Sequence, residues 1–165
     1  MLKKIIVKIN LFLVNKLFCG TRFFGIKRKL LKNCGFVIGK NTKVVGPLRV
    51  TGDLIIGENC WIGTGFTVHG NGSVTIGSDC DIAPDVVFLT GSHEIGDSGR
   101  RAGKGKKFDI VIGNSSWVGA RSTFCENIAI GNSCIIGACS FVNKNFSTDT
   151  FIAGAPAKDK RKLDK

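Results

Sequence analysis

An apolar residue recurs every six positions through most of this chain, and this period constrains the fold more than any other feature. Counting in sixes from Ile38 reaches Val74 with Ile or Val at every step, a slip of two residues leads to Ile76, and the count resumes at Ile112 after an interruption. Sixteen of sixteen positions are apolar, so the repeat is real. They are Ile38, Val44, Val50, Ile56, Ile62, Val68, Val74, Ile76, Ile82, Phe88, Ile112, Val118, Phe124, Ile130, Ile136 and Val142.

The neighbouring positions of each hexad indicate what the repeat builds. Gly or Ala usually follows the apolar residue directly, as at Gly57 and Gly119, and a small side chain often stands four residues after it, as at Cys60 and Ser122. A helix of about 3.6 residues per turn would scatter a six-residue period around its circumference, and each glycine would cost it roughly 1 kcal/mol. The pattern instead predicts short strands joined by tight corners, in coils that stabilise one another by stacking.

The length and the composition indicate one folded domain with short appendages. The chain has 165 residues, 43 % of them hydrophobic, with 22 glycines and 3 prolines, which supports a single core. We expect a basic amphipathic segment over residues 1–32, the repeat domain over residues 33–158 with residues 90–108 inserted as a loop, and a basic tail over residues 159–165.

The cysteines and histidines argue against a disulfide framework and a metal site. The seven cysteines are an odd number without a Cys-x-x-Cys pair, and the two histidines are His69 and His93. This usage fits reduced thiols in a cytoplasmic protein, and we expect no bound metal. Cys60, Cys80 and Cys134 occupy the small position of the hexad, where a free thiol packs as a small hydrophobe.

The charge of the chain favours an anionic partner without naming it. Lys and Arg outnumber Asp and Glu by 24 to 12, giving a formal net charge of +12. The basic clusters lack the spacing of nucleic-acid-binding motifs, so no nucleic acid is expected. Near the start, Ile5, Ile9 and Phe12 recur at helical spacing among lysines, in a stretch too short to span a bilayer. This segment either packs on the main body or a neighbouring subunit, or it contacts an anionic membrane surface.

Two stretches resemble a known family. Residues 56–63 (Ile-Gly-Glu-Asn-Cys-Trp-Ile-Gly) and 112–119 (Ile-Gly-Asn-Ser-Ser-Trp-Val-Gly) are similar to the hexapeptide-repeat acyltransferases, in the branch of maltose, galactoside and colanic-acid acetyltransferases. The resemblance covers roughly residues 20–158. It implies an all-β fold, a left-handed parallel β-helix with three hexads per coil, a short N-terminal helical segment and one protruding catalytic loop. It also implies a homotrimer with active sites between subunits.

The resemblance assigns the catalytic base to the inserted loop. Residues 82–85 (Ile-Ala-Pro-Asp) and 90–93 (Thr-Gly-Ser-His) are similar to the family patterns Ile-Ala-Pro-Asn and Thr-Gly-His. In the family, a His at the place of His93 takes the proton from a sugar hydroxyl as it attacks the acetyl thioester directly. An imidazole suits this task because its unperturbed pKa lies near the working pH. His69 matches no family residue, and we expect no role for it.

Other residues near this loop are expected to bind the acceptor or to support His93. Asp85 either binds a sugar hydroxyl, orients the imidazole or is a solvated turn carboxylate. Glu94 either holds the tautomer of His93 or points away from it. Ser92, Arg100 and Arg101 are further candidates for the acceptor site.

The resemblance places the acetyl-CoA groove after the loop. Trp117, Gly119, Ala120, Gly137, Ala138, Asn143, Lys144 and Lys158 match positions that line this groove in relatives, and residues 152–158 (Ile-Ala-Gly-Ala-Pro-Ala-Lys) are similar to the closing motif of the family. The N–H of Gly119 or Ala120 is the candidate oxyanion donor, and Lys144 and Lys158 are candidates to pair with the coenzyme phosphates. Residues 125–129 and 143–145 depart from the family pattern.

The sequence therefore predicts an acetyl-CoA-dependent O-acetyltransferase that acts on a hydroxyl of a sugar or of a surface-polysaccharide precursor. It is expected in the cytoplasm or peripherally at the inner face of the membrane. The alternatives are a non-catalytic β-helix that scaffolds proteins or binds a nucleotide sugar, and an acetyltransferase for an amine or a serine acceptor.

Overall fold

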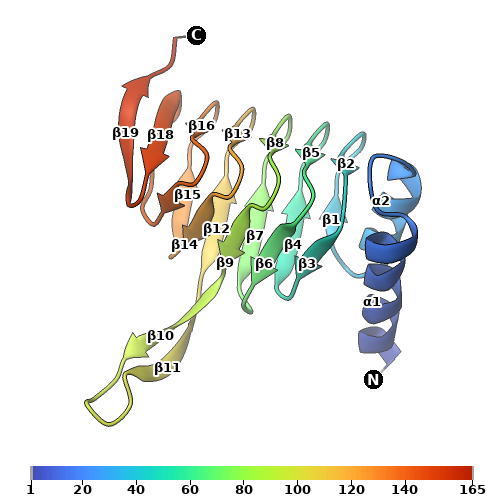
Figure 1. Ribbon diagram of the computed structural model, residues 1–165, viewed down its shortest axis with the longest axis horizontal. Helices are drawn as coiled ribbons and strands as arrows, with labels where there is room; N and C mark the ends of the chain where they lie inside the picture. Colours follow the sequence, from blue (N-terminus) through green and yellow to red (C-terminus); the bar gives the residue numbers. More distant parts are fainter. Residues whose placement is uncertain (1, 165) are drawn as a thin grey trace.

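The fold is a three-sided parallel β-helix capped by helices, as the computed structural model of residues 2–164 shows (Figure 1). Two helices and a π-helical turn precede the strands: α1 (Leu2–Phe12), η1 (Leu13–Leu17) and α2 (Phe24–Asn33). Side chains are described from residue 5 onward. The expected all-β fold and its N-terminal helical segment are confirmed.

Three sheets form the sides of the prism, and successive strands move from one sheet to the next. Sheet 1 contains β1 (Val37–Ile38), β4 (Asp53–Ile56), β7 (Ser73–Ile76), β12 (Asp109–Ile112) and β15 (Ile128–Ile130). Sheet 2 contains β2 (Lys43–Val44), β5 (Trp61–Ile62), β8 (Asp81–Ile82), β13 (Trp117–Val118), β16 (Ile135–Ile136), β18 (Thr150–Gly154) and β19 (Ala157–Lys162). Sheet 3 contains β3 (Leu48–Val50), β6 (Phe66–His69), β9 (Val87–Leu89), β14 (Thr123–Cys125) and β17 (Phe141–Val142).

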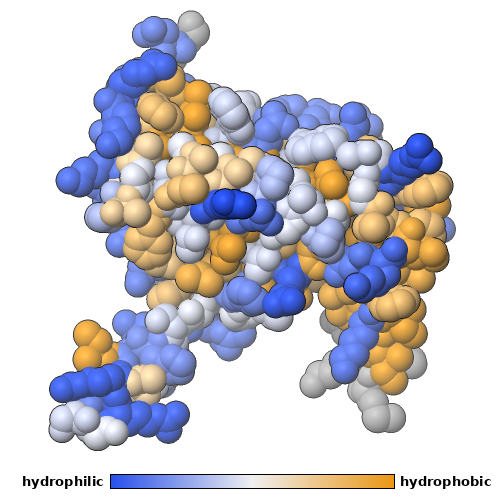
Figure 2. Space-filling model, viewed as in Figure 1, coloured by the Kyte–Doolittle hydropathy of each residue, from blue (hydrophilic) through white to orange (hydrophobic). Residues whose placement is uncertain are grey.

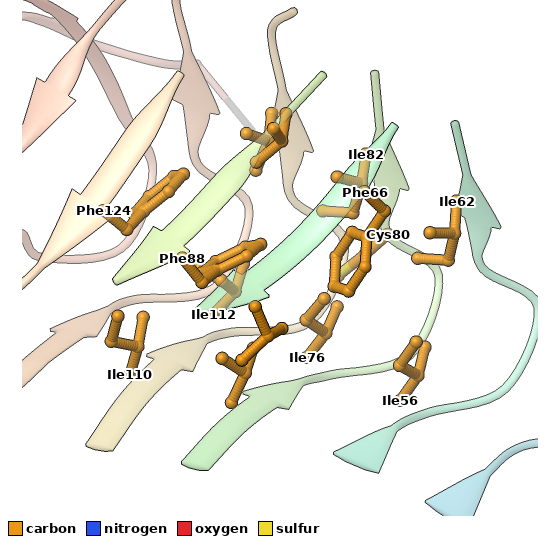
Figure 3. Close-up of a cluster of buried hydrophobic side chains, with 14 of the residues drawn as sticks. Ile56, Ile62, Phe66, Ile76, Cys80, Ile82, Phe88, Ile110, Ile112 and Phe124 are labelled. Atoms are coloured by element: carbon orange, nitrogen blue, oxygen red, sulfur yellow. The ribbon is translucent and has the colours of Figure 1, made fainter. Parts of the chain in front are cut away.

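The hexad positions point into the prism and form its core. All sixteen are buried, and Figure 3 shows several of them, such as Ile56, Ile76 and Ile112, stacked coil upon coil. Inside sheet 3 the rings of Phe66, Phe88 and Phe124 lie 5.4 and 4.9 Å apart. Each coil thus covers the apolar row of the one before it, as the period predicts.

One detail of the sequence count changes in the structure. Val74 pairs with Leu54, and Ile76 pairs with Ile56, so Ile76 rather than Val74 follows Val68 in the hexad series. The two extra residues lie in the corner before β7, and Val74 is a second inward residue of that strand.

The small residue of the hexad supports a hydrogen-bond ladder between coils. Thr42 donates to Gly57 O at 2.6 Å, Cys60 to Gly77 O at 3.1 Å and Cys80 to Gly113 O at 3.2 Å. These thiols are buried and free. Hydroxyl and thiol groups are interchangeable here because each is small and reaches the same carbonyl one coil further on.

The N-terminal helices cover the open end of the prism. Val14 and Leu31 are fully buried in the main core. Lys27 is also fully buried, and its Nζ donates to Gly20 O at 2.6 Å and to Val45 O at 3.1 Å. Packing on the main body was one of the two expectations for the N-terminal segment, and its buried residues pack in that way as the cap of the first coil.

Two antiparallel hairpins interrupt the regular winding. The predicted loop forms an arm of two paired strands, β10 (Gly91–Ile95) and β11 (Ala102–Lys107), which projects from the prism (Figure 1). At the other end β18 pairs with β19. Residues 159–162, expected as part of a tail, belong to β19.

Candidate active site

The arm leaves the prism at the corner between sheet 3 and sheet 1, and backbone bonds fix its base. Thr90 N donates to His69 O at 2.7 Å, and Phe108 N donates to Thr90 O at 3.0 Å. Thr90 and Phe108 are both buried. The first residues of the arm are therefore held at a defined place against the preceding coil.

A hollow of about 570 Å³ lies where the arm meets the prism. Its lining contains two of the expected site residues, Ser92 and His93, and it is completed by His69, Gly70, Asn71, Leu89, Gly91, Gly105, Lys106 and Lys107. No carboxylate is among these residues. The hollow is thus a polar, cationic recess beside an imidazole.

His69, for which the sequence predicts no role, lies beside His93. It ends β6, directly after inward Val68, and its exposed side chain lines the same hollow as His93. The hexad repeat could have indicated this position. Val68 pairs with Phe88 one coil later, so His69 and the start of the arm lie at the same corner of the prism. The expectation of no role for His69 rested on its place in a turn-rich corner and on the absence of a family match.

Other acceptor candidates lie further out on the arm. His93 pairs with Gly105, and the register then shifts before Ile95, so Glu94 stands at an irregularity. Glu94 is exposed, and the described hydrogen bonds include none between its carboxylate and His93. Arg100 and Arg101 are exposed near the tip and do not line the hollow. The roles expected for these three residues stay predictions.

Asp85 lies at a different corner from His93. It occupies the turn between sheets 2 and 3 with a φ of 59°, and its Oδ2 is 4.0 Å from Arg121 Nε. It borders a separate recess together with Lys16 and Arg49. Within one chain the structure therefore does not bring Asp85 to the hollow of His93.

An apolar groove of about 490 Å³ runs along sheet 2 and its corner with sheet 3. Its lining includes all five small or aromatic residues expected near the coenzyme: Trp117, Gly119, Ala120, Gly137 and Ala138. Ala83, Ile135, Ile136 and Phe151 complete it. A Cβ on Gly119 would lie 2.5 Å from Ala138 N, so the coils approach closely at this point and leave a smooth apolar floor.

Hydrogen bonding distinguishes the two candidate oxyanion donors. The N–H of Gly119 donates to Ile136 O at 2.8 Å and belongs to the ladder between coils. Among the hydrogen bonds of the described residues, none uses the N–H of Ala120. Of the two groups, Ala120 is the one available to a ligand in the groove.

The remaining coenzyme candidates lie outside the groove lining. Lys144 is exposed, with its Nζ 5.2 Å from the centroid of the Phe146 ring. Asn143 is exposed at the end of β17, and Lys158 is exposed on β19. These residues surround the C-terminal coils, and their contacts to a coenzyme stay predictions.

The groove and the hollow lie on different edges of the prism. The groove belongs to sheet 2 and the hollow to the corner of sheets 3 and 1, and the arm points away from the edge that carries β13 and β16 (Figure 1). Within residues 2–164 we find no cluster of three metal-ligating side chains and no helix long and apolar enough to cross a membrane.

Comparison with known proteins finds a family model that matches part of the chain and relatives that are similar to most of it. Residues 109–144 match the family model described as bacterial transferase hexapeptide (six repeats). The chain is 29 % identical over 140 residues to the galactoside O-acetyltransferase of Escherichia coli, covering 84 % of this chain and 69 % of that protein. It is 28 % identical over 130 residues to the putative colanic acid biosynthesis acetyltransferase of the same species, covering 78 % of this chain and 70 % of that protein.

A solved structure has the same fold over nearly its whole length. A hexapeptide-repeat-containing acetyltransferase from Vibrio cholerae superposes with a TM-score of 0.85 at 22 % identity, covering 100 % of this chain and 94 % of that chain. The same Vibrio protein in complex with acetyl coenzyme A superposes with a TM-score of 0.78 at 23 % identity, covering 99 % and 88 %.

Proposed function

We propose that this chain, a hexapeptide-repeat acyltransferase, transfers an acetyl group from acetyl-CoA to a hydroxyl group of a carbohydrate. The observation that carries the proposal is the pairing of an apolar groove that suits a pantetheine arm with a polar hollow that presents an imidazole. The relatives named as O-acetyltransferases support the class of reaction, and the acetyl-CoA complex of the Vibrio protein supports the donor.

His93 is the general base of the proposed reaction. Its ring lines the hollow from a strand whose base is fixed by buried Thr90 and Phe108. A neutral imidazole accepts the proton of the acceptor hydroxyl as the oxygen attacks the thioester carbon, and it returns the proton to the departing thiolate. The charge that develops on the thioester oxygen needs a backbone donor, and the N–H of Ala120 supplies it.

The groove of sheet 2 holds the donor. Acetyl-CoA supplies the acyl group as a thioester, which the acceptor oxygen attacks without a covalent enzyme intermediate. Trp117 and Phe151 provide apolar walls, and the close coils at Gly119 and Gly137 let an extended chain lie against the backbone. Lys144 and Lys158 are the proposed partners of the phosphates.

The complete site requires a second copy of the chain. The groove and the hollow of one chain are separated by the width of sheet 3, so a base and a thioester within reaction distance come from neighbouring subunits. A closed trimer repeats this contact three times. Asp85 and Arg121 are exposed at the corner between sheets 2 and 3, and we expect them to contact a neighbouring subunit.

The acceptor site favours a carbohydrate, including an anionic one. The hollow offers Asn71 and Ser92 as hydrogen-bonding groups for hydroxyls, and Lys106 and Lys107 as partners for a carboxylate or phosphate. A precursor of a surface polysaccharide fits this chemistry, and cytoplasmic sugar nucleotides or lipid-linked sugars carry such groups.

Release of free coenzyme A tests the proposal. The assay uses acetyl-CoA with a panel of neutral sugars, acidic sugars and sugar nucleotides, read by chromatography because the chain has seven thiols. We expect release that depends on a carbohydrate hydroxyl and an O-acetylated product. Absence of acetyl-CoA binding would instead leave a scaffold, and transfer to amines alone would contradict O-acetylation.

A further inference from the structure

The N-terminal helices carry more exposed large hydrophobic side chains than any other part of the described chain. Among the side chains from residue 5 to residue 164, twelve large hydrophobic ones are exposed, and seven of them lie between residues 5 and 26. They are Ile5, Ile6, Ile9, Phe12, Leu17, Phe23 and Ile26, with exposed fractions from 39 % to 65 %. Figure 2 shows apolar surface gathered over α1 and α2 at one end of the molecule.

This surface is not left over from packing against the prism, because another side of α1 and η1 already packs there. Asn10 and Val14 are buried and Leu11 packs against the core, so one side of the helix already faces the protein. Ile5, Ile9 and Phe12, spaced i, i+4 and i+7, form the other side. The fold accounts for the first side and leaves the second in contact with solvent.

The charged residues of the N-terminal segment itself have one sign. Residues 1–33 contain nine Lys and Arg and no Asp or Glu. Lys8, Lys16, Arg22 and Lys29 are exposed beside the apolar residues. A helical surface that combines large aliphatic and aromatic side chains with lysines binds the interface of an anionic bilayer. Burial of the apolar side chains and attraction of the lysines to anionic lipids both favour binding.

We propose that the outer side of residues 5–29, here called the N-terminal face, docks on an anionic lipid bilayer. A second copy of the chain is a poorer occupant, because a symmetric contact through this face would bring two sets of lysines together. The inference does not depend on the acetyl-transfer activity, since the N-terminal face shares no residue with the hollow or the groove.

Co-sedimentation of the full chain with lipid vesicles tests the inference. Vesicles of phosphatidylcholine with phosphatidylglycerol are compared with phosphatidylcholine alone, at about 0.1 M and about 0.5 M salt. We expect binding to the anionic vesicles, at least about tenfold weaker binding to the neutral ones, and weakening by salt. Equal binding to both kinds, or none to either, would overturn the proposal.

Two variants and a control locate the contact. Ile9→Gln/Phe12→Gln removes apolar surface and Lys8→Gln/Lys16→Gln removes charge, and each is expected to weaken binding about tenfold or more. All four side chains are exposed, so the fold is retained. Ile95→Gln, 91 % exposed on the arm, is the control and should bind like the unaltered chain.

Which variants lose vesicle binding shows whether the N-terminal face or the arm makes the contact. If Ile95→Gln loses binding and the N-terminal variants do not, the arm is the contact and the proposal is wrong. If Ile9→Gln/Phe12→Gln lowers the oligomer mass by light scattering while vesicle binding is unchanged, the N-terminal face joins copies of the chain, which also overturns it.

Discussion

At the residue scale, the fold depends on positions where a coil touches the next one. Glycine follows the inward residue because a Cβ there would meet backbone: on Gly113 it would lie 2.6 Å from Asn132 N. On Gly105, in the arm, a Cβ would meet nothing within 4 Å. The close approach of the coils therefore requires glycine in the prism, and no such contact requires it at Gly105 in the arm.

Substitution of these glycines should separate the two cases. Gly113→Ala forces the coils apart and is expected to lower the free energy of unfolding by about 1–3 kcal/mol. Gly105→Ala, the matched control, should change it by about 0.5 kcal/mol or less. Urea unfolding of both variants measures the difference, and equal midpoints would show that the coil spacing is not limiting.

The sequence predicted which residues face the core. The sixteen inward positions are all buried, because a strict period leaves little freedom in which side chain faces the core. The sequence did not predict that His69 lies beside His93, because insertions at the corners set their neighbours: two extra residues precede β7, and a hairpin follows β9. Such insertions do not follow the period, so the sequence fixes neither their shape nor the residues they bring together.

At the scale of elements, α2 caps the first coil, and its buried Lys27 contacts that coil. The Nζ of Lys27 lies 4.6 Å from the centroid of the Phe24 ring and donates to carbonyls of Gly20 and Val45. Burial lowers the pKa of Lys27 below its usual value. At pH values between the pKa of Lys27 in the folded chain and its pKa in the unfolded chain, the unfolded chain binds more protons at this group. The contribution of Lys27 to the free energy of unfolding therefore rises with pH across that range.

Replacing this lysine should loosen the cap. Lys27→Met leaves two carbonyls without their donor and is expected to cost about 1–3 kcal/mol. The deficit relative to the unaltered chain should grow as the pH rises through the alkaline range toward the unfolded pKa. Lys29→Met, exposed one half-turn away, is the control and should show neither effect in urea unfolding at two pH values.

At the scale of the whole molecule, the β-helix separates the proposed acetyl-CoA groove from the hollow that His93 lines. Five of the eight predicted coenzyme residues line one groove, and His93, the proposed base, lines another recess. The sequence predicted both sets through resemblance to a family, but the distance between them within one chain follows only from how the three sheets close. The proposed trimer resolves this separation.

Mixed oligomers test that shared site. His93→Ala removes the proposed base and Ala138→Trp fills the groove, so we expect each variant alone to be inactive. Co-expression should restore about one quarter of the unaltered rate per site, because each of the two halves of a site is intact with a chance of about one half. Mixing preformed oligomers without subunit exchange is the control, and no recovery after co-expression would place both halves in one chain.

The most direct test of the account is the rate of acetyl transfer by His93→Ala, measured as acceptor-dependent coenzyme A release, with acetyl-CoA affinity measured in parallel. The account predicts a fall in kcat/KM of about a hundredfold or more with unchanged acetyl-CoA affinity, because His93 lies outside the groove. A variant that keeps a rate within about threefold of the unaltered chain would contradict His93 as the base.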